Sequence, residues 1–158
     1  MNIRHSICIT LLIVLARLLS AEEQLTKVVG VHDGDTISVL TTSKTELKIR
    51  LAGIDAPELK QAFGSKARQA LSGMIFGKTV RLVISGKDHY GRSLAEVYTL
   101  DNTFINLEMV KLGYAWDYVR FTKGKLFKDA EAAARAGRKG LWQDDKPIPP
   151  WEWRKEEK

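Results

Sequence analysis

Two short stretches of this sequence carry closely spaced carboxylates, the groups that a hard cation needs. The first is Asp33-Gly-Asp-Thr36, and the second is Arg50-Leu-Ala-Gly-Ile-Asp-Ala-Pro-Glu58. Calcium and magnesium take oxygen ligands from carboxylates, carbonyls and water. Arginine binds phosphate oxygens as a planar fork, and a third stretch, Asp88-His-Tyr-Gly-Arg92, adds a second arginine to Arg50. Acidic groups and arginines together favour a metal-dependent phosphodiesterase.

Each of these signals, taken alone, also has an ordinary structural explanation. Asp33-Gly34-Asp35 is typical of a turn, and Glu58 alone would be read as an exposed loop glutamate. Most surface arginines pair with a carboxylate or with water. His89 is a candidate proton carrier, but a single loop histidine is more often an ordinary polar residue. The hypothesis of a site therefore depends on the joint order and spacing of the stretches.

Composition limits the class of protein and the kind of metal site. The 158 residues are enough for one domain with a sizeable core, and the net charge of +6 with a pI near 9.5 favours polyanionic partners such as nucleic acid. Cys8 is the only cysteine, which excludes a disulfide framework. The three histidines cannot build a thiolate zinc site with it, so any metal must be held mainly by oxygen.

The first residues have the pattern of a targeting segment. Arg4 and His5 give a basic start, and the run 6–16 is uncharged and mostly apolar. This run is shorter than the roughly 18 residues of a membrane-spanning helix, which favours a signal peptide over residues 1–21 with a cut after Ala21. We therefore expect a secreted or periplasmic protein. An uncleaved membrane anchor is the alternative.

Hydrophobic periodicity and turn residues predict an α+β domain at residues 22–143 whose strands close a small barrel. Leu47, Ile49 and Leu51 alternate with Lys48 and Arg50, so Arg50 should point away from the core toward a ligand. Proline and charge in the tail, residues 144–158, predict an irregular or mobile segment. The expected strands span 28–31, 36–40, 47–51, 79–84 and 94–100, and the expected helices span 64–76, 106–112 (with Asn106 as its cap) and 126–138.

Taken together, these motifs resemble the staphylococcal-nuclease-like (thermonuclease) family over residues 28–142. The resemblance rests on four stretches: 31–36, 50–58, 88–92 with Leu94-Ala95, and 106–115. It implies a five-stranded OB-type β-barrel with three α-helices, in agreement with the periodicity.

The resemblance also implies a set of site residues. Family members bind one Ca²⁺, which here would be held by Asp35, Asp55 and the backbone carbonyl of Ala56. The catalytic set of the family corresponds to Arg50, Glu58 and Arg92 in this chain. The substrate-contacting tyrosines of the family correspond to Tyr90 and Tyr118.

The function implied is that of a secreted, calcium-dependent endonuclease. It would hydrolyse DNA and RNA with little sequence preference and leave 3′-phosphate ends. We expect a monomer without a stable protein partner. Two alternatives stay open: a non-catalytic OB-fold module that binds single-stranded nucleic acid, and an envelope-attached protein whose barrel binds a partner. The DNA or RNA preference, the physiological role and the exact compartment are not predicted.

Overall fold

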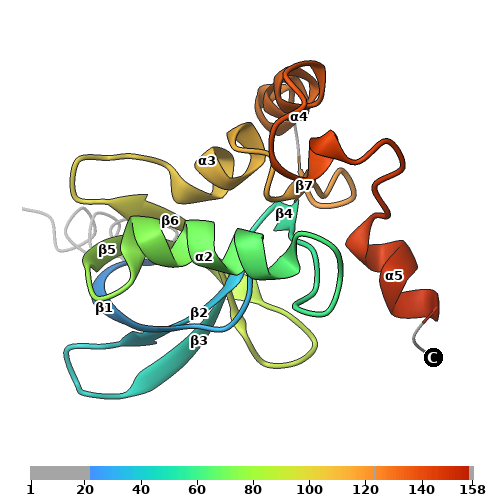
Figure 1. Ribbon diagram of the computed structural model, residues 1–158. Helices are drawn as coiled ribbons and strands as arrows, with labels where there is room; N and C mark the ends of the chain where they lie inside the picture. Colours follow the sequence, from blue (N-terminus) through green and yellow to red (C-terminus); the bar gives the residue numbers. More distant parts are fainter. Residues whose placement is uncertain (1–21, 123, 157–158) are drawn as a thin grey trace, which may run out of the picture.

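Five strands close into the barrel predicted from the sequence. In the computed structural model, which describes residues 22–122 and 124–156, the strands run in the order β1-β2-β3-β6-β5, and β5 returns to β1 (Figure 1). All neighbouring pairs are antiparallel except β3 and β6, which are parallel. The α+β class and the five-stranded OB-type barrel are therefore confirmed. The strands are β1 (Glu22–Val31), β2 (Thr36–Leu40), β3 (Glu46–Leu51), β5 (Thr79–Lys87) and β6 (Ser93–Thr99).

Strand β1 begins six residues earlier than the predicted start at Val28. Its first part, Glu22–Lys27, pairs with β5, and its second part pairs with β2 across a register shift after Val28. The first part carries almost no apolar signal, and its one large apolar side chain, Leu25, is 57% exposed. Backbone pairing, rather than side-chain burial, extends this strand.

The three predicted helices are present as α2 (Gly64–Ile75), α3 (Ile105–Lys111) and α4 (Leu126–Ala136). A short 3₁₀ turn, η1 (Gly140–Gln143), follows α4. The expected count of three α-helices is wrong, because the described residues contain a fourth, α5 (Pro150–Glu156), inside the supposedly irregular tail. Pro150 occupies the first helical position, where proline is favoured, and the Pro149 carbonyl accepts the N–H groups of Glu152 and Trp153.

Two very short strands bring a distant segment next to the second acidic stretch. Strand β4 (Ile54–Asp55) pairs with β7 (Trp116–Asp117), and Asp55 lies opposite Trp116. Tyr118, the residue that follows β7, donates its backbone N–H to the Gly53 carbonyl at 3.0 Å. This pairing places Tyr118 beside the Asp55 loop.

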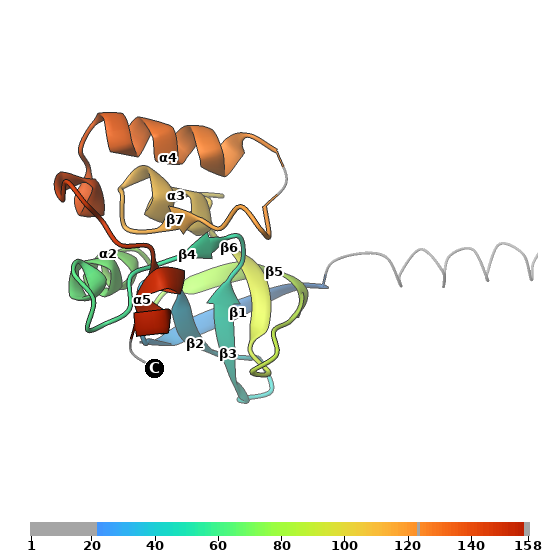
Figure 2. The ribbon, with the colours of Figure 1, turned by 90° about the vertical axis from the view of Figure 1, so that its right-hand side faces the viewer.

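The main core fills the barrel and the space beneath α2 and α3. Helix α2 crosses the barrel and buries Ala67, Leu71 and Ile75 completely. A smaller aromatic cluster contains Trp116 and Trp142, with Trp151 of α5 packed against it. Figure 2 shows α5 on the same side of the molecule as β4, with α3 and α4 above the barrel. No helix among residues 22–122 and 124–156 is long and apolar enough to cross a bilayer.

Asn106 has a different role from the predicted helix cap. It lies inside α3 and is completely buried. Its Oδ1 accepts the Val97 N–H at 2.9 Å, and its Nδ2 donates to the carbonyls of Ala52 and Ala95 at 2.9 and 3.1 Å. Asn106 therefore joins α3 to β6 and to the loop that leads into β4. The predicted signal peptide, residues 1–21, lies outside the described residues.

Candidate active site

The turn between β1 and β2 holds the first carboxylate. The Asp35 N–H donates to Asp33 Oδ1 at 2.9 Å, which is the bond that shapes an Asp-initiated turn. A side chain larger than that of glycine does not fit at position 34, because a Cβ atom there would lie 2.6 Å from the Ala56 Cβ and 2.7 Å from the Ala67 Cβ. The turn is thus packed between the second acidic loop and α2, and this contact brings Asp35 to Ala56.

Asp35 is a buried carboxylate with several donors. Its Oδ2 accepts the Ala56 N–H at 2.6 Å, its Oδ1 accepts the Thr36 hydroxyl at 3.1 Å, and its side chain is only 7% exposed. Burial raises the pKa of Asp35 well above its usual value, and the nearby Arg50 guanidinium opposes the rise. The neighbouring carboxylates Asp33 and Asp55 raise this pKa further. Burial and the neighbouring carboxylates thus both disfavour the charged form of Asp35, and a cation beside it would favour that form.

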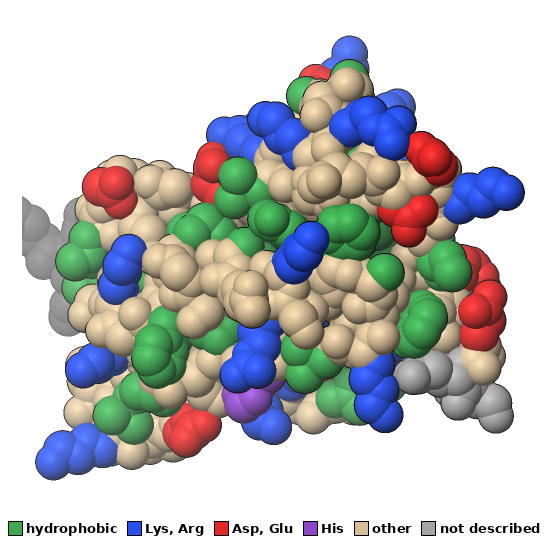
Figure 3. Space-filling model, viewed as in Figure 1, with side chains coloured by type: hydrophobic (Ala, Val, Ile, Leu, Met, Phe, Trp, Pro, Cys, Tyr) green, Lys and Arg blue, Asp and Glu red, His purple; other side chains and the backbone are tan. Residues whose placement is uncertain are grey.

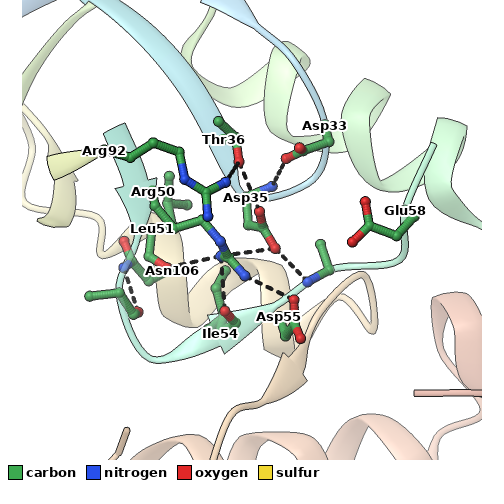
Figure 4. Close-up of polar contacts among 12 residues, drawn as sticks. Asp33, Asp35, Thr36, Arg50, Leu51, Ile54, Asp55, Glu58, Arg92 and Asn106 are labelled. Atoms are coloured by element: carbon green, nitrogen blue, oxygen red, sulfur yellow. Dashed lines mark hydrogen bonds and ion pairs between the residues drawn. The ribbon is translucent and has the colours of Figure 1, made fainter. Parts of the chain in front are cut away.

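Arg50 bridges the two aspartates that come from separate loops. Its Nη1 lies 2.9 Å from Asp35 Oδ2, and its Nη2 lies 2.8 Å from Asp55 Oδ1 (Figure 4). Nη1 also donates to the carbonyls of Leu51 and Ile54. The strand alternation is confirmed here, because Ile49 and Leu51 are buried in the core while Arg50 points into the site.

Arg92 reaches the same region from the loop between β5 and β6. Asp88 organises that loop: its Oδ1 accepts the backbone N–H groups of Tyr90 and Arg92, each at 2.9 Å, and its Oδ2 accepts Arg92 Nε at 2.7 Å. Partial burial raises the pKa of Asp88, but the hydrogen bonds from Arg92 outweigh it and the net shift is downward. Arg92 Nη1 lies 3.4 Å from the Thr36 hydroxyl, so Arg92 approaches the Asp35 turn.

Glu58 is fixed through its backbone. Its N–H donates to Gln61 Oε1 at 3.1 Å, and Gly64 packs so closely that a Cβ there would lie 1.8 Å from the Glu58 carbonyl oxygen. Figure 4 shows the Glu58 carboxylate on the opposite side of Asp35 from Arg50 and Arg92. The Glu58 carboxylate and the guanidinium groups of Arg50 and Arg92 therefore lie on different sides of Asp35.

One cleft of about 1040 Å³ joins all the residues predicted from the sequence. Its walls also contain Lys48 and Lys87, which add positive charge. On the face drawn in Figure 3, Lys and Arg side chains are spread out rather than gathered in one patch, so charge on this face does not locate the site. The predicted residues that line the cleft are Asp35, Arg50, Asp55, Ala56, Glu58, Tyr90, Arg92 and Tyr118.

The groups in this cleft that could coordinate a metal ion are carboxylates and backbone carbonyls. Within the part of the chain that the structure describes, no group of three or more His, Cys, Asp and Glu side chains is arranged around a common point. Asp35 and Asp55 are nevertheless close enough to share one guanidinium. Such a pair suits a cation that completes its shell with carbonyl, water and substrate oxygens. The N–H of Ala56 contacts Asp35, and the role of its carbonyl stays a prediction.

Among the cleft residues that the sequence reasoning missed, two lie on α5. Arg154 Nη1 donates to Glu58 Oε1 at 2.7 Å, and Nη2 donates to Asp55 Oδ2 at 2.7 Å. Bonding to Asp55 raises the pKa of Arg154 above its usual value. Trp151 stacks on Tyr118, with centroids 5.6 Å apart and rings 11° from parallel. The sequence signal that could have indicated this helix is a pair of prolines followed by an aromatic residue and, three residues later, a basic residue.

Comparison with known proteins gives a consistent result. A model of the family "Staphylococcal nuclease homologue" matches residues 48–144. An "Uncharacterized endonuclease" of Haemophilus influenzae is 44% identical over 159 residues, covering 99% of this chain and 89% of the relative. A protein of the same description from Escherichia coli O157:H7 is 41% identical over 128 residues, covering 81% and 83%. The "Micrococcal nuclease" of Shigella flexneri is 41% identical over 143 residues, covering 84% and 81%.

Proposed function

The chain belongs to the staphylococcal nuclease homologue family, and from this premise we propose that it is a calcium-dependent endonuclease. Its reaction would be hydrolysis of phosphodiester bonds in DNA and RNA, leaving 3′-phosphate ends. The observation that carries the proposal is the shared cleft, in which two buried aspartates, one glutamate and two arginines from three separate stretches of the chain converge. Relatives named as endonucleases and as micrococcal nuclease support the same reaction class.

The metal part of the proposal rests on the chemistry of Asp35 and Asp55. Asp55 is 1% exposed and Asp35 is 5% exposed, so their charges need cationic partners, which are guanidinium groups in this structure and which a metal ion could also supply. Their oxygens suit Ca²⁺, with the Ala56 carbonyl as a further ligand. When bound, Ca²⁺ would supply Lewis-acid chemistry at the phosphorus centre.

The remaining steps are assigned to residues of the chain. Glu58 orients a water and accepts its proton as the water oxygen attacks phosphorus. The bond from phosphorus to the 5′ oxygen breaks, that oxygen takes a proton from solvent and leaves as a 5′-hydroxyl, and Glu58 returns its proton to solvent. Arg50 and Arg92 stabilise the charge that builds on the phosphoryl oxygens during this exchange. These oxygens lie in every nucleotide, so the reaction needs no particular base.

Substrate binding in this proposal depends on phosphates rather than base edges. Lys48 and Lys87 line the cleft with the two arginines and would contact the polynucleotide backbone. Tyr90 lines the cleft and is 74% exposed, and Tyr118 lines it next to the β4 strand that carries Asp55. Such contacts are compatible with both DNA and RNA.

We also propose that the protein acts as a monomer outside the cytoplasm. The localisation rests on the basic start and apolar run of residues 1–21. Sequencing the N-terminus of the protein recovered from cells tests it: a new terminus at Glu22 is expected, and an intact Met1 in a membrane fraction would favour the anchor instead.

The experiment that tests the function is a digestion assay on single-stranded DNA and on RNA with a panel of divalent metals. Cutting that depends on Ca²⁺, stops with a calcium-selective chelator and yields 3′-phosphate ends is the expected result. Binding without cutting under all metals would instead favour the non-catalytic nucleic-acid-binding module.

A further inference from the structure

Helix α5 lies at the candidate active site but is attached to the rest of the protein by few side chains. Figures 1 and 2 show it on the outside of the molecule, joined to η1 by residues 144–149. Within α5 only Pro150 is buried, while Trp151 and Arg154 line the cleft. The helix is therefore held by individual side-chain contacts and not by a buried apolar face.

The first attachment of this helix is aromatic. Trp151 stacks on Tyr118 and packs edge-on against Trp116, with ring centroids 5.6 Å apart in both pairs. In the segment before α5, the Ile148 carbonyl accepts a hydrogen bond from Gln61 Nε2 at 2.5 Å. Both ring contacts of Trp151 are made within the protein, so this residue fixes the start of α5 beside the cleft.

The second attachment uses the carboxylates assigned to the metal and to the attacking water. Arg154 Nη1 lies 3.2 Å from Asp55 Oδ1 and 2.7 Å from Glu58 Oε1, and its Nη2 lies 2.7 Å from Asp55 Oδ2. Arg50 Nη2 also holds Asp55 Oδ1. Both oxygens of Asp55 are thus bonded to guanidinium groups while α5 is in place. A metal ion that takes Asp55 as a ligand is repelled by the positive charge of Arg154, so the two compete for this carboxylate.

We propose that α5 is an autoinhibitory latch, which in its docked position withholds Asp55 from the cation and Glu58 from the attacking water. Release of α5 makes both carboxylates available. The inference rests on the proposed function, since it takes Asp55 as a ligand of Ca²⁺ and Glu58 as the residue that orients water. The latch lies beyond the segment that matches the family model, which ends at residue 144.

The docked position is weak enough for a cation to displace. The Arg154 side chain is 40% exposed and that of Glu58 is 36% exposed, and ion pairs with this much exposure contribute little because water screens them. The buried Asp55 has a positive partner in both positions of the latch, Arg154 when α5 is docked and the cation when it is released. A helix of seven residues is not stable in water by itself. Once Arg154 is displaced, the backbone amides of α5 should therefore exchange faster with solvent.

The test is hydrogen–deuterium exchange of the purified full chain, read by mass spectrometry, in Ca²⁺ and in a chelator. Ca²⁺ should make a peptide that spans residues 150–156 exchange at least about threefold faster. Peptides from the barrel should exchange equally fast or more slowly, because a bound ligand stabilises the folded state. The opposite sign in α5 separates release of the latch from a general effect of the ion. Unchanged or slower exchange of α5 in Ca²⁺ would overturn the proposal.

Arg154→Ala removes the contacts of α5 with both carboxylates. In the chelator its α5 peptide should already exchange faster than that of wild type, and Ca²⁺ should change it little. Exchange as slow as in wild type would show that Arg154 does not hold the helix and would overturn the latch. The matched control is Lys155→Ala, which removes a pair with Glu152 on the same helix and should behave as wild type does.

Cutting of a single-stranded oligonucleotide, measured under the same conditions, separates the latch from the proposed function. Ca²⁺-dependent cutting while α5 stays protected would overturn the latch and leave the endonuclease standing. Release of α5 by Ca²⁺ without any cutting would refute the endonuclease and leave the latch standing.

Discussion

Arg154 Nη1 lies 2.7 Å from Glu58 Oε1, although the two residues are 96 positions apart in the chain. The same guanidinium also bonds both oxygens of Asp55, at 3.2 and 2.7 Å. One residue of α5 thus contacts the glutamate assigned to the attacking water and an aspartate assigned to the cation. Arg50 Nη2 also contacts Asp55 Oδ1, at 2.8 Å, so two guanidinium groups share one buried carboxylate.

This arrangement predicts that Arg154 weakens calcium binding. A cation that binds Asp55 must displace Arg154 from it. The Arg154 side chain is 40% exposed, so the ion pair that is lost contributes only a small free energy. Arg154→Ala should therefore bind Ca²⁺ about two- to fivefold more tightly in a calorimetric titration. Lys155→Ala is the control, because Lys155 pairs with the exposed Glu152 on α5 and, among the described residues, with no residue of the cleft. Weaker binding by Arg154→Ala would contradict this prediction.

Asp88 is predicted to act through Arg92. Asp88→Asn keeps the shape of the loop residue but removes the charge that holds Arg92 Nε at 2.7 Å. We expect cleavage to slow by about tenfold, less than for Arg92→Ala, because the guanidinium remains but is less well fixed. Rates of cutting measured at saturating substrate for the two variants check the order.

Asp88 also gives a pH dependence of stability with a defined sign. Its pKa is lower in the folded protein than the ordinary value of 3.8, because hydrogen bonds from Arg92 outweigh the effect of burial. The stabilisation is therefore present above pH 3.8 and is lost as the pH falls through the folded pKa. The difference in unfolding free energy between wild type and Asp88→Asn, at most about 1 kcal/mol at neutral pH, should shrink in acid. A difference that grows on acidification would reverse the assigned sign.

Gly34 and Gly73 form a matched pair for testing how the Asp33–Asp35 turn packs. Gly34→Ala would place a Cβ 2.6 Å from the Ala56 Cβ, and we expect it to cost about 1–3 kcal/mol of stability. Calcium affinity should fall too, since Asp35 and Ala56 would be pushed apart. Gly73→Ala, inside α2 with nothing within 4 Å of the new atom, should instead stabilise by up to about 1 kcal/mol. Urea unfolding and calcium titration of both variants give the comparison.

Asn106 is predicted to be a structural residue. Asn106→Ala leaves the Val97 N–H and the carbonyls of Ala52 and Ala95 without their buried partner. We expect a loss of about 2–4 kcal/mol in urea unfolding. Lys111→Ala, which removes only an exposed pair with Glu108 on the same helix, should change stability by less than about 0.5 kcal/mol. A similar small loss for Asn106→Ala would show that these bonds contribute little.

Much of the site could be predicted because its residues lie in short local patterns. Alternation in β3 was enough to place Arg50 opposite the core, since side chains on a strand point to alternate faces. The turn at Asp33-Gly34-Asp35 was visible from residue types alone. The family resemblance then supplied the pairing of distant loops that no local pattern contains.

What could not be predicted depends on contacts between distant residues. Helix α5 has only seven residues and forms where Trp151 and Arg154 find partners in the cleft, so its own sequence is a weak signal. Asn106 was assigned as a cap because asparagine favours helix starts, but its actual partners lie on β6 and in the loop before β4. The start of β1 was missed because it is stabilised by backbone pairing to β5.

The central claim is that the cleft containing Asp35, Asp55, Glu58, Arg50 and Arg92 hydrolyses phosphodiester bonds. Its most direct test is the initial rate of Ca²⁺-dependent cutting of a single-stranded oligonucleotide by wild type and by Glu58→Ala. The account predicts a rate about 10²–10⁴-fold lower for the variant, with a native fold and unchanged melting temperature. Equal rates for the two proteins would contradict it.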